Sequence, residues 1–360
     1  MAEPEAAEPA AAGERPGLTI VRGSAQDDEA RDRFVRAHPD GTFFHLSGWR
    51  RAIENLYGHE PIELVARRGG ELVGVLPMML CQRLRGGRHL VSQPYAVYGG
   101  PVAEDRETVL ALVDEARAVG QALRVGNVEL RCLHDPLLDV PRSELYWTFL
   151  RDLPADPDEV LARMPKKARA DARKARDKYG LELGEGRWYV DDLARLFLAN
   201  KHGLGSPALP RRHFQELIRH FGDDVFVHVV RQSRRPLSAV MSIAFRDTLI
   251  AYYAGAEPGA DRSYKASNYM YLALQEWAVR RGFRRFDFCR SRADSGAFAF
   301  KCHQGFVPQP LHYRFLLVRD RRVPAFTPSN PRTRILQAAW SRLPRWLVRR
   351  VSAGLAPYLP

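Results

Sequence analysis

The sequence predicts an α/β protein with two similar domains that follow one another along the chain. Three observations support this prediction. Each half has the same order of elements, namely a helix, a two-stranded hairpin, a third strand, a second helix and a last strand. Glycines end the helices at nearly equal spacing, 62 residues from Gly58 to Gly120 and 60 residues from Gly222 to Gly282. A chain of 360 residues also exceeds the length of one ordinary domain.

The first half opens with a helix expected over 46–58. Two apolar runs over 62–80 surround a Gly-Gly pair and predict a hairpin. A strand near 89–91, a helix over about 106–120 and the strand NVELRCL follow. Because strands that flank a crossover helix are parallel whereas hairpin strands are antiparallel, we expect a mixed sheet.

The second half repeats this order. A helix is expected over 209–222, a hairpin over 225–245 and a strand over 249–256. The helix over 267–282 then leads to the last strand, RFDFC at 285–289. The sequence therefore predicts two domains with mixed, splayed sheets and flanking helices.

Composition sets the expected boundaries. Residues 1–17 are mainly Ala, Glu and Pro and predict a disordered acidic tail. The first domain is expected over 18–150, and the second over 151–320, which opens with two consecutive helices of basic character. Residues 321–360 are expected to form a basic amphipathic segment, split near Pro344.

The net charge of +13 is concentrated in two short segments. Residues 163–178 and residues 331–360 each carry a net charge of +6. Such segments favour anionic partners, namely nucleic acid, a phosphorylated substrate or anionic lipid, and a solvated helix face is the alternative for each. The cations of the first segment that we expect to follow a nucleic-acid backbone are Lys166, Lys167, Arg169, Arg173 and Lys174.

Several classes of protein do not fit the sequence. The N-terminal residues lack the basic start and apolar stretch of a signal peptide, and no apolar run approaches the roughly 18 residues that span a bilayer. The cysteines form no C-x-x-C pair, which argues against a disulfide framework and a zinc site. We expect a cytoplasmic protein without a bound metal. Tryptophans and arginines in the last segment favour peripheral contact with the inner membrane, and docking of that segment on its own protein is the alternative.

The stretch DFCRSRADSGAFAFKCHQGF (287–306) contains the main catalytic candidates. Lys301 lies among phenylalanines, where a fixed cation could stabilise an oxyanion. A lysine on a half-buried strand, with its ammonium in solvent, is the alternative. Asp287 could orient a lysine or act as a base, although a structural aspartate fits the sequence equally well. His312 is the nearest candidate for a general base.

Other polar groups are candidates for substrate binding. Arg290 follows the last strand and could bind phosphate or carboxylate through its planar guanidinium, with a surface arginine as the alternative. The loop EPGADRSYKASN (257–268) could hold a phosphorylated ligand or be a plain surface loop; its candidates are Arg262, Tyr264, Lys265 and Asn268.

The first half offers a matching loop. Tyr95 and Tyr98 could line a cleft between the domains or pack in the core, and Gly99 and Gly100 would allow close approach of a ligand to the backbone. Trp49 of the opening helix completes the candidates for substrate or donor binding.

Six segments, taken together in their order, resemble the FemAB family, most closely the FemAB-like proteins associated with exosortase/PEP-CTERM systems. They are FHLSGWRRAIENLYGH, YGGP, KKARADARKARDKYGLEL, DFCRS…FAFKCHQGF, PQPLHY and NPRTRILQAAWSRLPRWLVRR. The resemblance implies two tandem GNAT-like domains that transfer an aminoacyl or acyl group onto an amine of a cell-envelope or exopolysaccharide precursor. It places Lys301 at the junction of donor and acceptor. It implies no bound cofactor, with aminoacyl-tRNA or acyl-CoA as co-substrate.

Two departures from the family pattern narrow these expectations. Ile53 stands one turn after Trp49, where a lysine is expected in relatives that modify peptidoglycan precursors, so a muropeptide acceptor is in doubt. The loop 257–268 lacks the Q/R-x-x-G-x-G/A pattern that binds coenzyme A in this fold. That absence counts against an acyl-CoA-dependent N-acetyltransferase acting on an amino sugar or lipid, which stays an alternative. A non-catalytic RNA- or membrane-binding protein on the same scaffold is the other alternative.

Overall fold

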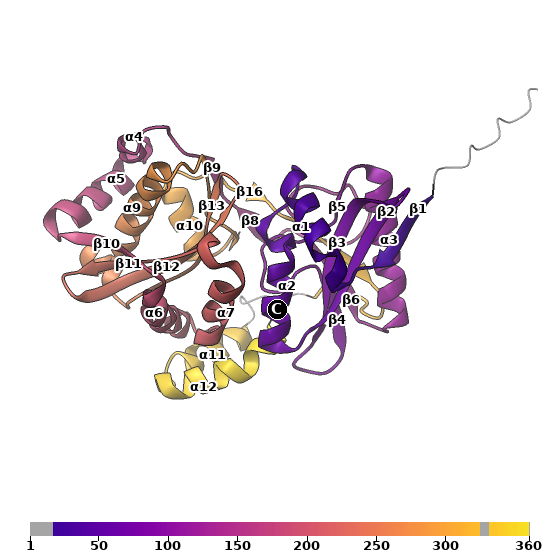
Figure 1. Ribbon diagram of the computed structural model, residues 1–360. Coiled ribbons are helices and arrows are strands. Elements are labelled where there is room, and N and C mark those ends of the chain that lie inside the picture. The colour runs from indigo at the N-terminus through magenta and orange to yellow at the C-terminus, as the bar shows by residue number, and fades with distance from the viewer. Residues whose placement is uncertain (1–16, 325–330, 360) are drawn as a thin grey trace, which may run out of the picture.

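The computed structural model of the protein describes residues 17–324 and 331–359. Except for Gly17, the acidic tail expected over 1–17 lies outside the described residues. Figure 1 shows two α/β halves side by side, with the C-terminal helices across one edge of both. The molecule is a mixed α/β protein, as the sequence predicts.

The first sheet has the strand order β1-β2-β3-β4-β6-β17-β7, with β5 paired to β3. Its strands are β1 (Leu18–Arg22), β2 (Glu60–Arg68), β3 (Glu71–Gln82), β4 (Arg88–Val91), β5 (Val102–Ala103), β6 (Asn127–Cys132), β7 (Arg142–Ser143) and β17 (His312–Leu317). β4 and β6 pair in parallel, and the β2–β3 hairpin is antiparallel, which confirms the expected mixed sheet.

Helices cover both faces of the first sheet. The helix α3 (Arg106–Ala122) packs on one face of this sheet. There it contacts the apolar residues that point to this face from the strands, among them Leu64 and Leu76. The helices α1 (Asp28–Ala37) and α2 (Ser47–Tyr57) lie on the opposite face, toward the second domain. Gly58 adopts the left-handed conformation (φ 65°) that ends α2, as the sequence predicts.

The second sheet has the order β10-β11-β12-β13-β14-β9. Its strands are β10 (Leu181–Glu185), β11 (Val225–Gln232), β12 (Arg235–Phe245), β13 (Thr248–Ala256), β14 (Arg285–Asp287) and β9 (Leu150–Asp152). β13 and β14 pair in parallel around a crossover that contains the short α8 (Ala260–Tyr264) and α9 (Ala266–Arg280).

The helices α4 (Asp158–Arg163), α5 (Lys166–Arg173) and α9 pack on one face of the second sheet. The helices α6 (Val190–Gly203) and α7 (Arg211–Phe221) cover the other face. This second face belongs to the same apolar core as α1 and α2 of the first domain. At Gly48 the contact is so close that an added Cβ would lie 2.9 Å from the Phe221 ring.

The two domains exchange strands. The strand β9, which precedes the basic helices, pairs with β14 at the edge of the second sheet, whereas β17, near the C-terminus, pairs with β6 and completes the first sheet. A third, small sheet of β15 (Ser291–Arg292), β8 (Tyr146–Thr148) and β16 (Gln309–Pro310) lies where the chain crosses between them. The expected boundaries at 150 and 320 therefore do not follow the sheets.

The segment after β14 differs from a strand. Residues 296–303 form the helix α10 (Gly296–His303), and the Ser295 hydroxyl accepts a hydrogen bond from the Phe298 N–H at its start. The half-buried strand considered as an alternative for Lys301 is therefore absent. The last helices are α11 (Pro331–Trp340) and α12 (Arg345–Leu355), and they meet near Pro344 as expected.

Candidate functional site

The candidate site lies where β13 and β14 separate. The two strands pair only over Thr248–Ile250 and Arg285–Asp287, although β13 continues to Ala256. The second sheet therefore opens beyond Asp287. Ligands of open α/β sheets bind at the carboxyl ends of such strands.

Asp287 is buried at this opening. Its carboxylate accepts hydrogen bonds from the backbone N–H of Cys289 (2.7 Å) and from the Tyr98 hydroxyl (3.1 Å) of the first domain. Burial raises the pKa of Asp287 from 3.8 to about 6. The carboxylate is thus able to take up and release a proton near neutral pH.

Lys301 of α10 faces the same opening, 7% exposed. Its ammonium donates hydrogen bonds to the carbonyl oxygens of Cys289 (2.8 Å) and Arg290 (3.3 Å). Burial lowers the pKa of Lys301 to about 8, so the amine is mainly charged at neutral pH. An ammonium has three N–H donors, and two of them are used here, which leaves one for a ligand.

The backbone at Cys289 explains how these carbonyls reach Lys301. Cys289 has a φ of 59°, a left-handed conformation that is costly for a residue with a Cβ. This conformation turns the chain sharply after β14. Strain of this kind is concentrated at functional sites.

Arg290 is held at the contact between the domains. Its guanidinium donates to the Tyr313 hydroxyl (2.9 Å) and lies 4.7 Å from the centre of the Tyr146 ring. The Tyr313 hydroxyl donates in turn to the carbonyl oxygen of Val97 (2.6 Å). The structure thus brings Arg290, Lys301, Asp287 and Tyr98 together at the contact between the domains.

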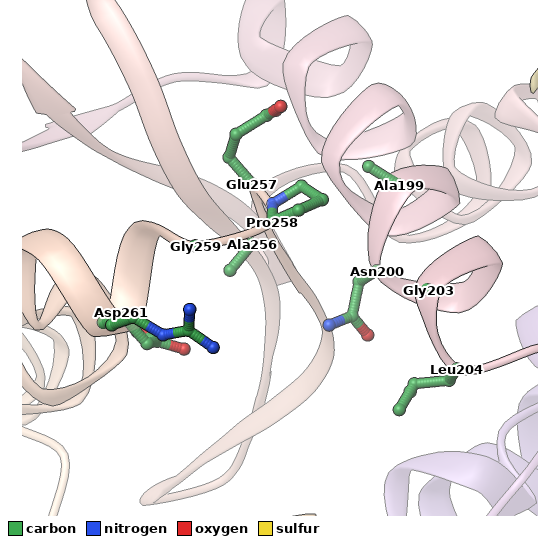
Figure 2. A pocket seen from close by; sticks show the side chains of 10 residues that line it. Ala199, Asn200, Gly203, Leu204, Ala256, Glu257, Pro258, Gly259 and Asp261 are labelled. Atoms are coloured by element: carbon green, nitrogen blue, oxygen red, sulfur yellow. The ribbon is translucent and has the colours of Figure 1, made fainter. Parts of the chain in front are cut away.

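A cavity of about 330 Å³ lies between the end of α6 and the β13–α8 loop. Figure 2 shows Asn200 on one side and Glu257 to Asp261 on the other. Arg262 lines the cavity, and no hydrogen bond or ion pair of the described residues involves its guanidinium.

The other candidates of this loop make contacts within the protein. The Lys265 ammonium lies 3.7 Å from the Asp171 carboxylate, and the Tyr264 ring packs edge-on against Tyr179. The Asn268 side chain accepts a hydrogen bond from Gln304 (2.6 Å).

The first-domain candidates divide between a cavity and the core. Tyr98, Gly99 and Gly100 line a second cavity of about 290 Å³. Gly100 allows a close approach of Cys132, rather than of a ligand, to the backbone. An added Cβ at Gly100 would lie 2.6 Å from the Cys132 sulfur. Trp49 is buried, with its indole N–H donating to the carbonyl oxygen of Pro94 (3.1 Å).

Tyr95 joins the core to the C-terminal segment. Its hydroxyl donates to the carbonyl oxygen of Ala356 (2.8 Å), and its backbone carbonyl accepts a hydrogen bond from Tyr252. Both Trp49 and Tyr95 therefore have structural contacts in this conformation.

His312 is not brought to Lys301. Its ring lies 3.7 Å from the Asp135 carboxylate, which lines the cavity of the first domain. Side chains alternate along a strand, so Tyr313 contacts Arg290 while His312 faces the opposite side of β17. This placement leaves Asp287 as the better-positioned proton acceptor.

The basic helices form a solvated face. On their inner side, the buried residues Ala168, Ala172 and Ala175 pack against the core of the second domain. None of the ion pairs among the described residues involves the five cations considered for nucleic acid, which are Lys166, Lys167, Arg169, Arg173 and Lys174.

Several residues of the site were missed from the sequence. Thr148 is hydrogen bonded to Tyr98, and Tyr146 and Tyr313 hold Arg290. These residues come from separate elements, and no local spacing marks them; only the PQPLHY segment, which contains Tyr313, was singled out by resemblance.

Comparison with known proteins supports the fold. The acetyltransferase (GNAT) domain model matches residues 162–301, so this part of the chain is similar to GNAT acetyltransferase domains. No curated protein matches the sequence.

Three solved structures align over most of the chain. The crystal structure of FemX has a TM-score of 0.62 at 13% identity and covers 84% of this chain and 98% of its own. A tandem GNAT protein from the clavulanic acid biosynthesis pathway has a TM-score of 0.52 at 14% identity, covering 83% and 98%. A protein of unknown function from Bacteroides thetaiotaomicron has a TM-score of 0.52 at 12% identity, covering 84% and 100%. These likenesses confirm the predicted tandem GNAT-like fold.

Proposed function

We propose that the protein is an N-acyltransferase of the FemAB type that transfers an aminoacyl or acyl group onto an amine. The observation that carries this proposal is the Lys301 ammonium, which is buried where β13 and β14 separate and keeps one N–H donor for a ligand. The matched GNAT domain and the fold shared with FemX support an acyl-transfer chemistry.

The residues suit the steps of this reaction. The acceptor amine attacks the carbonyl carbon of the donor, a C–N bond forms, and the carbonyl oxygen becomes an oxyanion. Lys301 would donate to that oxyanion, a role for which one donor is commonly worth about 2.7–4 kcal/mol. Collapse of the intermediate breaks the C–O or C–S bond to the leaving group. Asp287 would accept the proton from the amine, and the leaving group is released with a proton.

The donor is proposed to be aminoacyl-tRNA, with acyl-CoA as the alternative. The solvated cations of α5 support a nucleic-acid donor, since they have no carboxylate partners among the described residues. The 330 Å³ cavity next to α8 could hold the reactive end of either donor, with Arg262 on a phosphate.

The acceptor is proposed to be a phosphorylated precursor of the cell envelope or of an exopolysaccharide, as in systems associated with exosortase. The C-terminal helices would bring the protein to the anionic inner-membrane surface, because α12 exposes Trp346 together with Arg349 and Arg350. No helix of the described residues is long and apolar enough to cross a membrane.

The test is the binding of charged and deacylated tRNA to the full chain across a salt series. We expect charged tRNA to bind at least tenfold more tightly at physiological salt, because only it offers the acyl group to the site. Equal binding that vanishes with salt would overturn the aminoacyl donor, and radiolabelled acetyl-CoA would then be tested as the donor.

A further inference from the structure

Two tyrosines connect the basic helices with the short helix that borders the cavity of about 330 Å³. Tyr179 follows the basic helices and Tyr264 ends α8, and their rings pack edge-on with 5.6 Å between the ring centres. Both rings border the core of the second domain and are only partly buried. Arg262 precedes Tyr264 by two residues on α8 and lines the cavity. A ligand that covers the tyrosine pair would therefore lie next to the cavity wall.

A wide helical turn brings two lysines to the first of these rings. The helix α5 continues as a π-helical turn, Lys174–Lys178, and the Tyr179 N–H donates to the Lys174 carbonyl oxygen (3.3 Å). Residues five apart lie on different sides of an α-helix, which has about 3.6 residues per turn, whereas a π-helical turn brings them to one side. The ammonium groups of Lys174 and Lys178 accordingly lie 5.8 Å and 5.9 Å from the centre of the Tyr179 ring.

The cations around the tyrosine pair outnumber the carboxylates that could neutralise them. The three carboxylates of α5, of the π-helical turn and of α8 already have partners. They are Asp171 with Lys265 (3.7 Å), Asp177 with Arg176 (3.0 Å) and Asp261 with Ser267 (2.7 Å). Within the described part of the chain, no ion pair involves Lys174, Lys178 or Arg262, and all three side chains are exposed. This surface therefore favours an anionic ligand.

A single strand of RNA has the groups that this surface can bind. Proteins hold unpaired strands with cations along the phosphates and with aromatic rings on which successive bases stack. An anionic membrane is the other partner of a basic surface, but it is held by exposed apolar side chains as well. Among the described residues, none of the exposed large apolar side chains lies on α5, on the π-helical turn or on α8. The observations therefore favour RNA over a membrane here.

We propose that Tyr179 and Tyr264 stack unpaired bases of an RNA strand whose 3′ end reaches the cavity of about 330 Å³. Lys174 and Lys178 hold phosphates beside the first ring, and Arg262 holds a phosphate at the cavity. Stacking tolerates different bases, so the pair accepts the 3′ ends of different tRNAs. This inference rests on the proposed function, because it gives the path by which the donor tRNA brings its aminoacyl end to the site.

The test is fluorescence titration of the full chain with a short single-stranded RNA that has the sequence of the tRNA 3′ end and carries 2-aminopurine as its last base. Stacking on a ring quenches the fluorescence of that base. Tyr179→Leu and Tyr264→Leu are each expected to bind at least fivefold more weakly and to quench less, because leucine keeps apolar packing but offers no ring. Tyr179→Phe and Tyr264→Phe keep the ring and should bind within about twofold of the wild type, which separates loss of stacking from loss of folding.

Two controls separate stacking from charge. Tyr189 packs on the other face of the second sheet, with the Arg231 guanidinium 5.2 Å from its ring centre. Tyr189→Leu should therefore bind the RNA like the wild type. An RNA of the same length without bases keeps every phosphate, and the wild type should bind it about as weakly as the leucine variants of the pair bind the intact RNA.

Three results would overturn the proposal. The first is binding of the intact RNA by Tyr179→Leu and Tyr264→Leu that equals the wild type. The second is equal binding of the RNA with and without bases, since the surface would then bind charge alone. The third is a loss of binding to phosphatidylglycerol vesicles, but not to RNA, in the two leucine variants, which would make the pair a membrane contact.

The outcomes for this inference and for the proposed function are distinguishable. RNA binding that depends on Tyr179 and Tyr264, without any preference for charged over deacylated tRNA, would contradict the aminoacyl donor alone. A preference for charged tRNA that is unchanged in both leucine variants would contradict this inference alone.

Discussion

At the scale of residues, the site depends on two buried ionisable groups with opposite pKa shifts. Burial raises the pKa of Asp287 to about 6 and lowers that of Lys301 to about 8. At neutral pH both groups are therefore mainly charged and yet close to their titration ranges. Such pairs are typical of acid–base sites, although structural networks also produce them.

Asp287→Asn should stabilise the protein at neutral pH while it slows transfer. The folded pKa of about 6 exceeds the usual 3.8, so ionisation costs stability as the pH rises from 4 to 7, up to about 3 kcal/mol. The cost is absent below about pH 4, where the carboxyl is protonated in both states. Urea unfolding at pH 4, 5.5 and 7 measures the difference, which should grow with pH in favour of the variant.

The control for this prediction is Asp294→Asn, which removes an exposed aspartate that pairs with Arg292. Asp294→Asn should not be more stable than the wild type at pH 7. A stability difference between Asp287→Asn and the wild type that stays constant from pH 4 to 7 would contradict the proposed environment of Asp287. A transfer rate that keeps its full value in Asp287→Asn would remove its role as the base.

Lys301, Asp287 and Arg290 could be chosen as candidates from the sequence because they lie close together at and after the end of one strand. Polar residues that follow an apolar run mark the end of that strand. The sequence could not identify Thr148, because this residue reaches the site through pairing between distant elements. It also placed His312 with Lys301, whereas the strand alternation of β17 turns His312 toward Asp135.

At the scale of elements, the repeat of helix, hairpin, strand, helix and strand was predictable because apolar periodicity and glycine ends are local signals. Gly58 and the Gly-Gly turn after β2 have the left-handed backbone that these signals require. The helix α10 was harder to predict, since Phe298 and Phe300 alternate as in a strand. The Ser295 cap and tertiary contacts of Lys301 favour the helix instead.

We expect the helix α12 to contact the surface of anionic membranes. Its inner side is fixed by buried Val348 and by Ser352, whose hydroxyl accepts from the Ala208 N–H (3.2 Å). Its outer side exposes Trp346 (69%) together with Arg345, Arg349 and Arg350. Trp346→Ala should weaken binding to phosphatidylglycerol vesicles at least fivefold in cosedimentation, since a tryptophan at the headgroup level is lost.

A matched control is Trp188, which lies directly before α6 and is 75% exposed. Trp188→Ala should bind vesicles like the wild type, and neutral phosphatidylcholine vesicles should bind neither protein. Equal losses in the two variants would contradict a role for α12 in membrane contact.

At the scale of the whole molecule, the exchange of strands makes the domains interdependent. The strand β17 brings Tyr313, Phe315 and Leu316 into buried positions beside β6, and Tyr313 also holds Arg290 of the other domain. This link was not predictable from the order of elements, because the repeat ends before β17 begins. The chain was therefore divided at 320 although the first sheet needs residues 312–317.

A fragment of residues 17–150 should fail to fold alone, because it lacks β17 and loses the apolar surface that this strand buries. We expect no cooperative thermal transition by circular dichroism. A synthetic peptide of residues 308–320 should restore part of that transition when it is added in excess. Cooperative unfolding of the fragment without the peptide would contradict the interdependence.

Acyl transfer is expected to depend on the buried ammonium of Lys301. Its most direct test compares Lys301→Met with the wild type in the rate of label transfer from the donor that binds, alongside thermal melting. We expect Lys301→Met to lose at least tenfold in turnover and to keep its melting temperature within a few degrees, since methionine preserves the volume but supplies no donor. Normal turnover in a folded Lys301→Met protein would contradict it.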